Sequence, residues 1–261
     1  MASLSGKRAL VCGASRGIGK ACALEFARLG ASVTLLSRNQ NELAATRHLL
    51  SRTPEQQHEI LVADSAEPES LNAAVKQELD KRGPYQILLN NTGGPKAGPA
   101  LLASSEEFVA AFYQHLVSGQ VLVQTIVPGM KAAGYGRIIN IVSTSVKQPI
   151  PDLGVSNTIR GAVSSWAKTL AEELGPFGIT VNCILPGFIE TERLAELIRV
   201  KANTRKCDEQ QIRAEMLAQI PLGRFGKPEE IANVVGFLAS PQAAYVTGVN
   251  LPVDGGRTKS L

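Results

Sequence analysis

Three glycines near the start of the chain have a spacing that suits phosphate binding. The segment VCGASRGIG places them in the pattern G-x-x-x-G-x-G, after an apolar strand and before a helix predicted to begin near Ile18. Such glycines permit a tight turn and let backbone N–H groups approach a pyrophosphate at the positive end of the helix. An ordinary glycine-rich turn is the alternative, but the flanking strand and helix favour a nucleotide site. The residues predicted to bind the cofactor in this loop are Gly13, Ser15, Arg16, Gly17, Ile18 and Gly19.

The end of the second predicted strand indicates which dinucleotide is bound. Folds that prefer NAD place an acid there, against the ribose 2′-hydroxyl, whereas this chain has Ser37 and Arg38. An acid would repel a 2′-phosphate, but a guanidinium holds it through paired hydrogen bonds. Arg16 is predicted to reach the same phosphate from the other side. Two solvated arginines are the alternative, and the missing acid favours NADP(H).

Seven short apolar runs alternate with segments of helical period, which is the pattern of βαβ units. The runs are Arg8 to Cys12, Ser32 to Leu36, Glu59 to Ala63, Gln86 to Leu89, Arg137 to Val142, Thr180 to Leu185 and Asn250 to Val253. Strands this apolar fit a parallel sheet covered on both faces. We predict a single domain over residues 1–261 with a Rossmann-type, doubly wound α/β fold of seven mainly parallel strands and helices on both faces. The charged helical segment at about 190–219 is interpreted as a lid or substrate-side insertion.

Composition excludes several other classes of protein. Hydrophobic residues make up 44% of the 261 residues and charged residues 19%, as in an ordinary globular protein. The net charge of +4 is small and scattered, so no nucleic-acid partner is expected. Cys12 and Cys183 fall in predicted buried strands and the four cysteines lack metal-ligand spacing, so neither disulfides nor a metal site is expected. With no leader-like segment or apolar span, we expect a cytoplasmic protein without membrane contact.

Further motifs resemble the short-chain dehydrogenase/reductase family over nearly the whole chain. Residues 90–93, Asn-Asn-Thr-Gly, resemble the family's N-N-A-G motif, and residues 254–256, Asp-Gly-Gly, follow the last predicted strand as in many members. The chain looks most similar to 3-oxoacyl-acyl-carrier-protein reductases, in a divergent branch that carries N-N-T-G-G-P. The resemblance implies binding of adenine, ribose, nicotinamide and phosphate by residues beyond the glycine loop. These residues are Asp64, Ser65, Asn91, Gly93, Pro186, Gly187, Ile189 and Thr191.

The catalytic positions depart from the family pattern. Family members transfer a proton to the substrate oxygen with a Ser, a Tyr and a Lys, supported by an Asn on the preceding long helix. Ser143 matches the serine, although a strand-end cap is the alternative. Ser156 and Arg160 stand where the family has its tyrosine and lysine, and His115 stands where it has its asparagine. A serine hydroxyl is a far weaker acid than a phenol and a guanidinium stays protonated, so the usual relay cannot operate. His115 is a candidate proton donor, with a packed histidine as the alternative.

Two functions from different classes remain open. The first is an NADP(H)-dependent oxidoreductase acting on a small carbonyl or alcohol substrate, including an acyl thioester, with a proton from a group other than tyrosine or from water. The second is a catalytically silent NADP-binding sensor or partner subunit. The resemblance also implies a homodimer or homotetramer that pairs two long helices. They are predicted at Ser105 to Ala133 and Asp152 to Leu174, and both have apolar positions beyond one core stripe.

Overall fold

A single seven-stranded parallel sheet organises the chain. The computed structural model describes residues 3–260. The strands lie in the order β3-β2-β1-β4-β5-β6-β7, and every neighbouring pair is parallel. Their bounds are β1 Arg8–Cys12, β2 Ser32–Ser37, β3 Glu59–Val62, β4 Ile87–Asn90, β5 Gly136–Ile141, β6 Ile179–Pro186 and β7 Asn250–Val253. The predicted doubly wound α/β fold is confirmed, and the sheet is parallel throughout.

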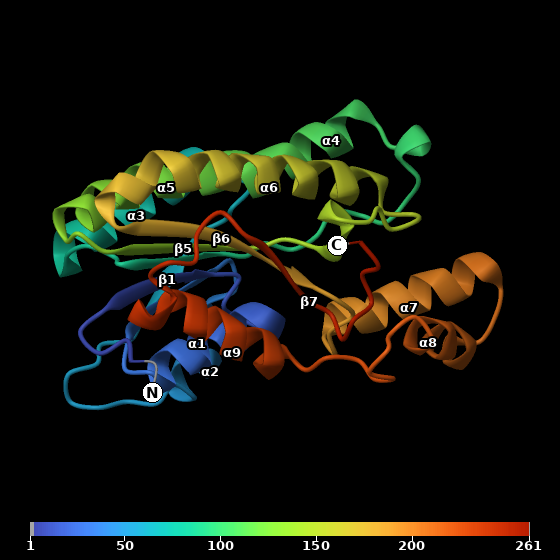
Figure 1. Cartoon of the computed structure of the whole chain (residues 1–261), viewed down its shortest axis with the longest axis horizontal. Helices are drawn as coiled ribbons and strands as arrows, with labels where there is room; N and C mark the ends of the chain where they lie inside the picture. Colours follow the sequence, from blue (N-terminus) through green and yellow to red (C-terminus); the bar gives the residue numbers. More distant parts are fainter. Residues whose placement is uncertain (1–2, 261) are drawn as a thin grey trace.

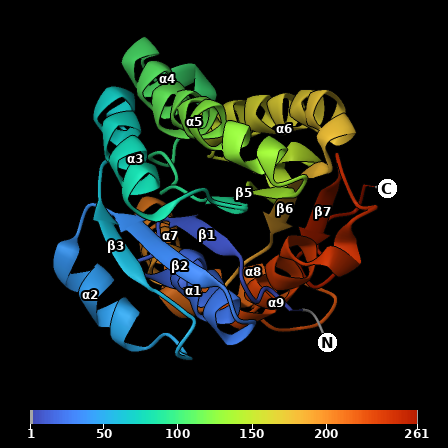
Figure 2. The ribbon, with the colours of Figure 1, turned by 90° about the vertical axis from the view of Figure 1, so that its left-hand side faces the viewer.

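Helices cover both faces of the sheet (Figures 1 and 2). One layer holds α1 (Gly17–Arg28), α2 (Gln40–His48) and α9 (Pro228–Ala239). The other holds α3 (Pro68–Arg82), α4 (Ser105–Phe112), α5 (Ser118–Ala132) and α6 (Gly154–Leu174). Short 3₁₀ turns occupy Ala100–Leu102 (η1), Thr144–Val146 (η3), Gly175–Phe177 (η4) and Pro241–Ala243 (η5).

The two covered faces explain why the strands are almost continuously apolar. In β1, Ala9 and Val11 pack into the core beneath α1 and α9, whereas Leu10 and Cys12 pack into the core beneath α3, α5 and α6. Side chains alternate between the faces of a strand, so a strand buried on both sides needs apolar residues at every position. This requirement accounts for the run RALVC and positions the end of β1 rigidly.

The predicted long helix from Ser105 to Ala133 is interrupted in the structure. Between α4 and α5, residues Tyr113–Val117 form one π-helical turn, η2. Such single turns widen a helix locally and occur often at functional sites. The interruption falls on His115, one of the predicted catalytic residues.

The segment predicted as a lid contains two helices outside the two main layers (Figure 1). They are α7 (Glu192–Arg205) and α8 (Glu209–Leu217), and they share a small apolar cluster of their own around Leu194, Ile198 and Ile212. Both lie beyond the carboxyl end of β6. Within residues 3–260, no helix combines the length and apolarity needed to cross a membrane.

Candidate active site

The strand order reverses between β1 and β4, and the predicted site lies at this edge. In open parallel sheets, ligands bind outside the carboxyl ends of the strands at such a reversal. The loops after β1, β4, β5 and β6 meet here, and they carry most of the residues singled out from the sequence.

The glycine loop forms a cradle that a side chain would fill. Gly13 has φ +61°, and a Cβ there would lie 2.7 Å from the backbone oxygen of Asn91. A Cβ on Gly19 would overlap the carbonyl oxygen of Gly13. The Asn91 amide donates to the carbonyl of Cys12 at 3.3 Å and so joins the loops after β1 and β4. Because no side chain caps the N-terminus of α1, its first N–H groups remain available to a phosphate.

At the adenine end of the predicted cofactor site, Arg38 is exposed and forms only a weak ion pair. The side chain of Arg38 is 73% exposed, with its Nη1 3.7 Å from Asp64 Oδ2. An exposed ion pair of this kind contributes little to stability. Arg38 can therefore leave Asp64 and turn toward a phosphate at a small cost in free energy. Ser37 accepts a hydrogen bond from the N–H of Asn39 at 3.4 Å.

Arg16, predicted from the sequence to reach the ribose phosphate, is paired with an acid in the structure. Its Nη1 lies 2.7 Å from Glu192 Oε2, in an exposed ion pair that joins the glycine loop to the start of α7. Contact with a ribose phosphate therefore requires this pair to open. That role of Arg16 stays a prediction.

The loop after β6 closes the other end of the cradle. Gly187 donates its N–H to the carbonyl of Val253 at 3.0 Å, and a Cβ on Gly187 would lie 2.7 Å from the Cα of Asp254. Ile189 is buried, and Thr191 caps α7 by accepting the N–H of Leu194. The methyl group of Thr191 lies 3.5 Å from where a Gly17 Cβ would be, so the β6 loop and the glycine loop are adjacent.

Ser143 and Ser156 are placed on neighbouring elements. Ser143 caps η3, and its hydroxyl oxygen accepts the N–H of Ser145 at 3.1 Å. This is the strand-end cap considered from the sequence, and it leaves the O–H of Ser143 free to donate. The 3₁₀ turn η3 contacts α6, the helix that carries Ser156. Ser156 is half-buried, and its hydroxyl has no hydrogen-bond partner among residues 3–260.

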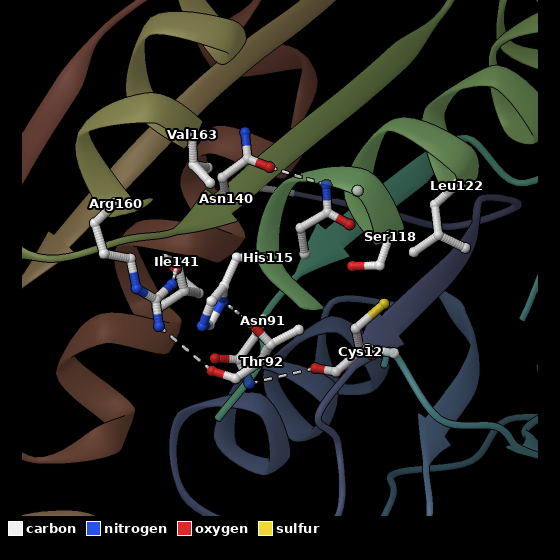
Figure 3. Close-up of a pocket in the computed structure, with 13 residues that line it drawn as sticks. Cys12, Asn91, Thr92, His115, Ser118, Leu122, Asn140, Ile141, Arg160 and Val163 are labelled. Atoms are coloured by element: carbon white, nitrogen blue, oxygen red, sulfur yellow. Dashed lines mark hydrogen bonds between the residues drawn. The ribbon is translucent and has the colours of Figure 1, made fainter. Parts of the chain in front are cut away.

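Arg160 is a buried cation held by backbone carbonyls (Figure 3). Its side chain donates to the carbonyl oxygen of Ile141 at 2.7 Å and to that of Thr92 at 3.5 Å. Only 8% of the residue is exposed, and no carboxylate within residues 3–260 pairs with it. Burial, and then the positive charge of Arg193, lower the pKa of Arg160 to about 10. Arg160 is still protonated at neutral pH.

His115 points into the same site from the π-helical turn (Figure 3). Its Nδ1 is hydrogen-bonded to the Thr92 hydroxyl, and its buried Nε2 has no partner in the described part of the chain. Burial, and then the charge of Arg160, lower the pKa of His115 to about 2. A histidine that is neutral at working pH can take part in a hydrogen bond but cannot deliver a proton as an imidazolium.

A cavity of about 10 Å³, room for roughly one water molecule, lies beside these side chains. Among the predicted site residues, Ser65, Asn91, His115 and Arg160 line it, whereas Ser143 and Ser156 do not. The lining residues that sequence reasoning did not assign to the site are Cys12, Asn90, Thr92, Ser118, Gly119, Leu122, Asn140, Ile141 and Val163. The Asn90 amide donates to Asn140 Oδ1 at 2.9 Å, across β4 and β5. The signal for Asn140 was present, because this residue interrupts the apolar run of β5.

Comparisons with known proteins match this geometry over nearly the whole chain. A family model described as Enoyl-(Acyl carrier protein) reductase matches residues 13–258. The chain is 39% identical to the 3-oxoacyl-[acyl-carrier-protein] reductase FabG of Pseudomonas aeruginosa, over 97% of this chain and 98% of the relative. It is 32% identical to the NADPH-dependent reductase BacG of Bacillus subtilis, over 99% and 100%. The chain therefore belongs to the short-chain dehydrogenase/reductase family of oxidoreductases, as its motifs predicted.

Solved structures agree with the fold. An NADPH-dependent reductase involved in bacilysin biosynthesis superposes with a TM-score of 0.92 at 32% identity, covering 98% of this chain and 100% of that one. The L-sorbose reductase of Gluconobacter frateurii, solved with NADPH and L-sorbose, gives a TM-score of 0.92 at 32% identity, covering 99% of each chain. Both are reductases described with NADPH, which is the cofactor predicted from Ser37 and Arg38.

Proposed function

We propose that this protein is an NADP(H)-dependent oxidoreductase acting on a small carbonyl or alcohol substrate, related to 3-oxoacyl reductases but with an altered proton-transfer site. The observation that carries the proposal is the cradle of Gly13, Gly19 and Asn91 at the uncapped N-terminus of α1. Backbone atoms of Gly13 and Asn91 and the side-chain amide of Asn91 lie so close there that only glycine fits, and glycine lets a pyrophosphate approach the backbone.

The residues around the cradle suit NADP(H). Arg38 is exposed and weakly paired, so it can hold a 2′-phosphate, and the loop from Pro186 to Thr191 lies against Gly17 for the nicotinamide end. When bound, the cofactor supplies or takes up the hydride. Asp64, Ser65, Asn91 and Gly93 complete the proposed adenine and ribose contacts.

The substrate oxygen is held by hydroxyl groups rather than by a phenol. Ser143 has a free O–H because the N–H of Ser145 uses one lone pair of its oxygen and not its proton, and the half-buried Ser156 adds a second hydroxyl on α6. Neither residue is acidic enough to release its proton near neutral pH. Arg160 keeps its proton, and His115 is a neutral imidazole whose remaining N–H is too weakly acidic to be released, so the proton comes from water. General acid help is typically worth about 10²–10⁴ in rate, and we therefore expect a slow reductase.

A silent NADP-binding protein is the second candidate, and the replacement of the tyrosine and lysine positions by Ser156 and Arg160 favours it. The two candidates share the glycine cradle, so cofactor binding does not separate them. Turnover does. NADPH oxidation would be followed with 3-oxoacyl thioesters, quinones and small ketones, with Ser143→Ala as the matched variant. Substrate-dependent oxidation that Ser143→Ala reduces supports the enzyme, whereas bound NADPH with no oxidation on any substrate supports the silent binder.

Two further proposals concern the outer elements. We assign α7 and α8 as a lid over the site, because α7 starts at the cradle and is held to it by the exposed pair between Arg16 and Glu192. We also propose a homo-oligomer through the long helices, because Val109 and Phe112 on α4 are 55% and 40% exposed. Light scattering on the purified protein tests the oligomer, and a monomer at micromolar concentration would contradict it.

A further inference from the structure

Arg160 is a positive charge buried without an opposite charge. Its hydrogen bonds go to the carbonyl oxygens of Ile141 and Thr92, and no acid pairs with it within residues 3–260. An unpaired buried ion costs several kcal/mol, and buried charges in proteins are ordinarily paired. A charge kept in this state at the carboxyl edge of the sheet is available to a ligand.

A second guanidinium stands over the same loop. Arg193, on the first turn of α7, donates to the carbonyl oxygen of Pro95 at 2.8 Å. Its Nη2 lies 3.8 Å from where a Cβ on Gly94 would be. Arg160 reaches the other end of the same loop at Thr92, and the two charges are close enough for Arg193 to lower the pKa of Arg160. The stretch from Thr92 to Pro95 is therefore contacted by two guanidinium groups, Arg160 from α6 and Arg193 from α7. Arg193 also forms an exposed ion pair with Glu196 at 3.0 Å.

We propose that the substrate of this site carries a carboxylate, which binds between Arg160 and Arg193. Two guanidiniums offer forks of N–H donors that match the two oxygens of a carboxylate, and an anion between them removes their mutual repulsion. His115 Nε2, buried and without a partner beside Arg160, can donate a further hydrogen bond to the same anion in its Nε2–H tautomer. The inference rests on the proposed reductase function and specifies its substrate as an oxo acid or hydroxy acid.

The unpaired charge of Arg160 favours an anionic ligand group over a neutral one. The cavity of about 10 Å³ beside Arg160 and His115 has room for one oxygen-sized group, and Arg193 does not line it. A neutral thioester would leave the buried charge of Arg160 uncompensated, whereas the exposed Arg193 already has Glu196 at 3.0 Å. A role limited to ribose hydroxyls would engage Arg160 but leave Arg193 without a function in the site.

Matched pairs of an acid and its methyl ester test this proposal. The steady-state kcat/KM with NADPH would be measured for 2-oxobutanoate and 4-oxopentanoate and for the methyl ester of each. We expect the wild type to favour at least one acid over its ester by about 10- to 100-fold, the usual worth of a charge-assisted pair. Arg193→Met should remove most of that preference by slowing the acid and not the ester. Arg193 is partly exposed at the surface, so this change is compatible with folding.

The control is Arg199→Met, which removes the same charge from the same helix. Arg199 is 66% exposed and faces Glu209 at 3.9 Å, away from the loop. The Arg199→Met variant should keep the wild-type preference for the acid over the ester. A wild type that reduces esters as well as acids, or an Arg193→Met variant that slows both equally, would overturn the proposal and leave the reductase function standing.

A binding measurement decides the matter if no carbonyl is reduced at all. In that case the proposed function fails, and calorimetry of 4-oxopentanoate and its methyl ester against the protein with NADPH tests the anion site separately. Binding of the acid alone, lost in Arg193→Met, supports the carboxylate site. Absence of binding by both compounds overturns it.

Discussion

Replacing Arg160 by Met tests whether this residue stabilises the fold or is kept for a role in the site. Burial, together with the nearby charge of Arg193, lowers its pKa from 12.5 to about 10. At about 1.36 kcal/mol per pKa unit, the charged form is disfavoured in the folded protein by roughly 3 kcal/mol. Methionine removes that penalty but also removes the hydrogen bond to Ile141 at 2.7 Å, which contributes about 1.5–3 kcal/mol for a charged donor. The two effects nearly cancel.

We therefore expect Arg160→Met to leave the free energy of unfolding unchanged or to raise it by up to about 2 kcal/mol, in urea titrations at pH 7. Arg137→Met is the matched control. Arg137 is also buried, but it donates to the carbonyl oxygens of Gly136, Gly178 and Ser240 and lies 4.1 Å from the ring of Tyr135. This substitution should destabilise by about 2–4 kcal/mol. A loss above about 2 kcal/mol in Arg160→Met would show that Arg160 braces the fold, and the reasoning for a functional charge would fail.

Three further substitutions test the cofactor and catalytic assignments. Arg38→Asp replaces a phosphate contact by repulsion, so calorimetry should show NADPH binding weakened by about 2–3 kcal/mol relative to NADH; equal wild-type affinities would contradict the role of Arg38. The double change Ser156→Tyr and Arg160→Lys should raise the rate of diketone reduction by part of about 10²–10⁴, and more than either single change; a wild-type rate already typical of the family would oppose this. His115→Asn should remove part of the pH dependence of the free energy of unfolding. The unfolded chain binds the His115 proton below about pH 6.5 while the folded chain resists it down to about pH 2, so wild-type stability falls by roughly 3 kcal/mol between pH 6.5 and 4. The variant should lose this dependence, and a control His48→Asn change on the surface should keep it.

The parts of the fold that follow from local pattern were predictable. Strands buried on both faces must be apolar at every position, so all seven were found, with ends that differ from the predicted runs by a residue or so, as for β5 at Gly136–Ile141. The glycine loop was predictable because Gly13 has positive φ and Gly19 has no room for a Cβ. Positive φ and the lack of room for a side chain both require glycine, so the residue type alone indicates them.

What the sequence did not show depends on contacts between distant segments. The π-helical turn at Tyr113–Val117 has no local signature, since its residues would fit an ordinary helix. The pair between Arg16 and Glu192 joins residues 176 positions apart. The approach of Arg193 to the loop that holds Thr92 depends on where α7 docks, and no residue pattern specifies that position. Arg193 was therefore not assigned from the sequence, and neither were the cavity-lining residues Cys12, Asn90 and Ile141 at the ends of β1, β4 and β5.

Transfer of hydride to a carbonyl carbon tests the central claim most directly. NADPH deuterated at one or the other face of its nicotinamide C4 would be incubated with the protein and 4-oxopentanoate or a small diketone, and the product analysed by mass spectrometry. Isotope detection registers even the slow turnover expected without a tyrosine. We predict deuterium at the carbinol carbon from one face only, and none without the protein. A protein that binds NADPH but transfers no deuterium to any of these carbonyls would contradict the account.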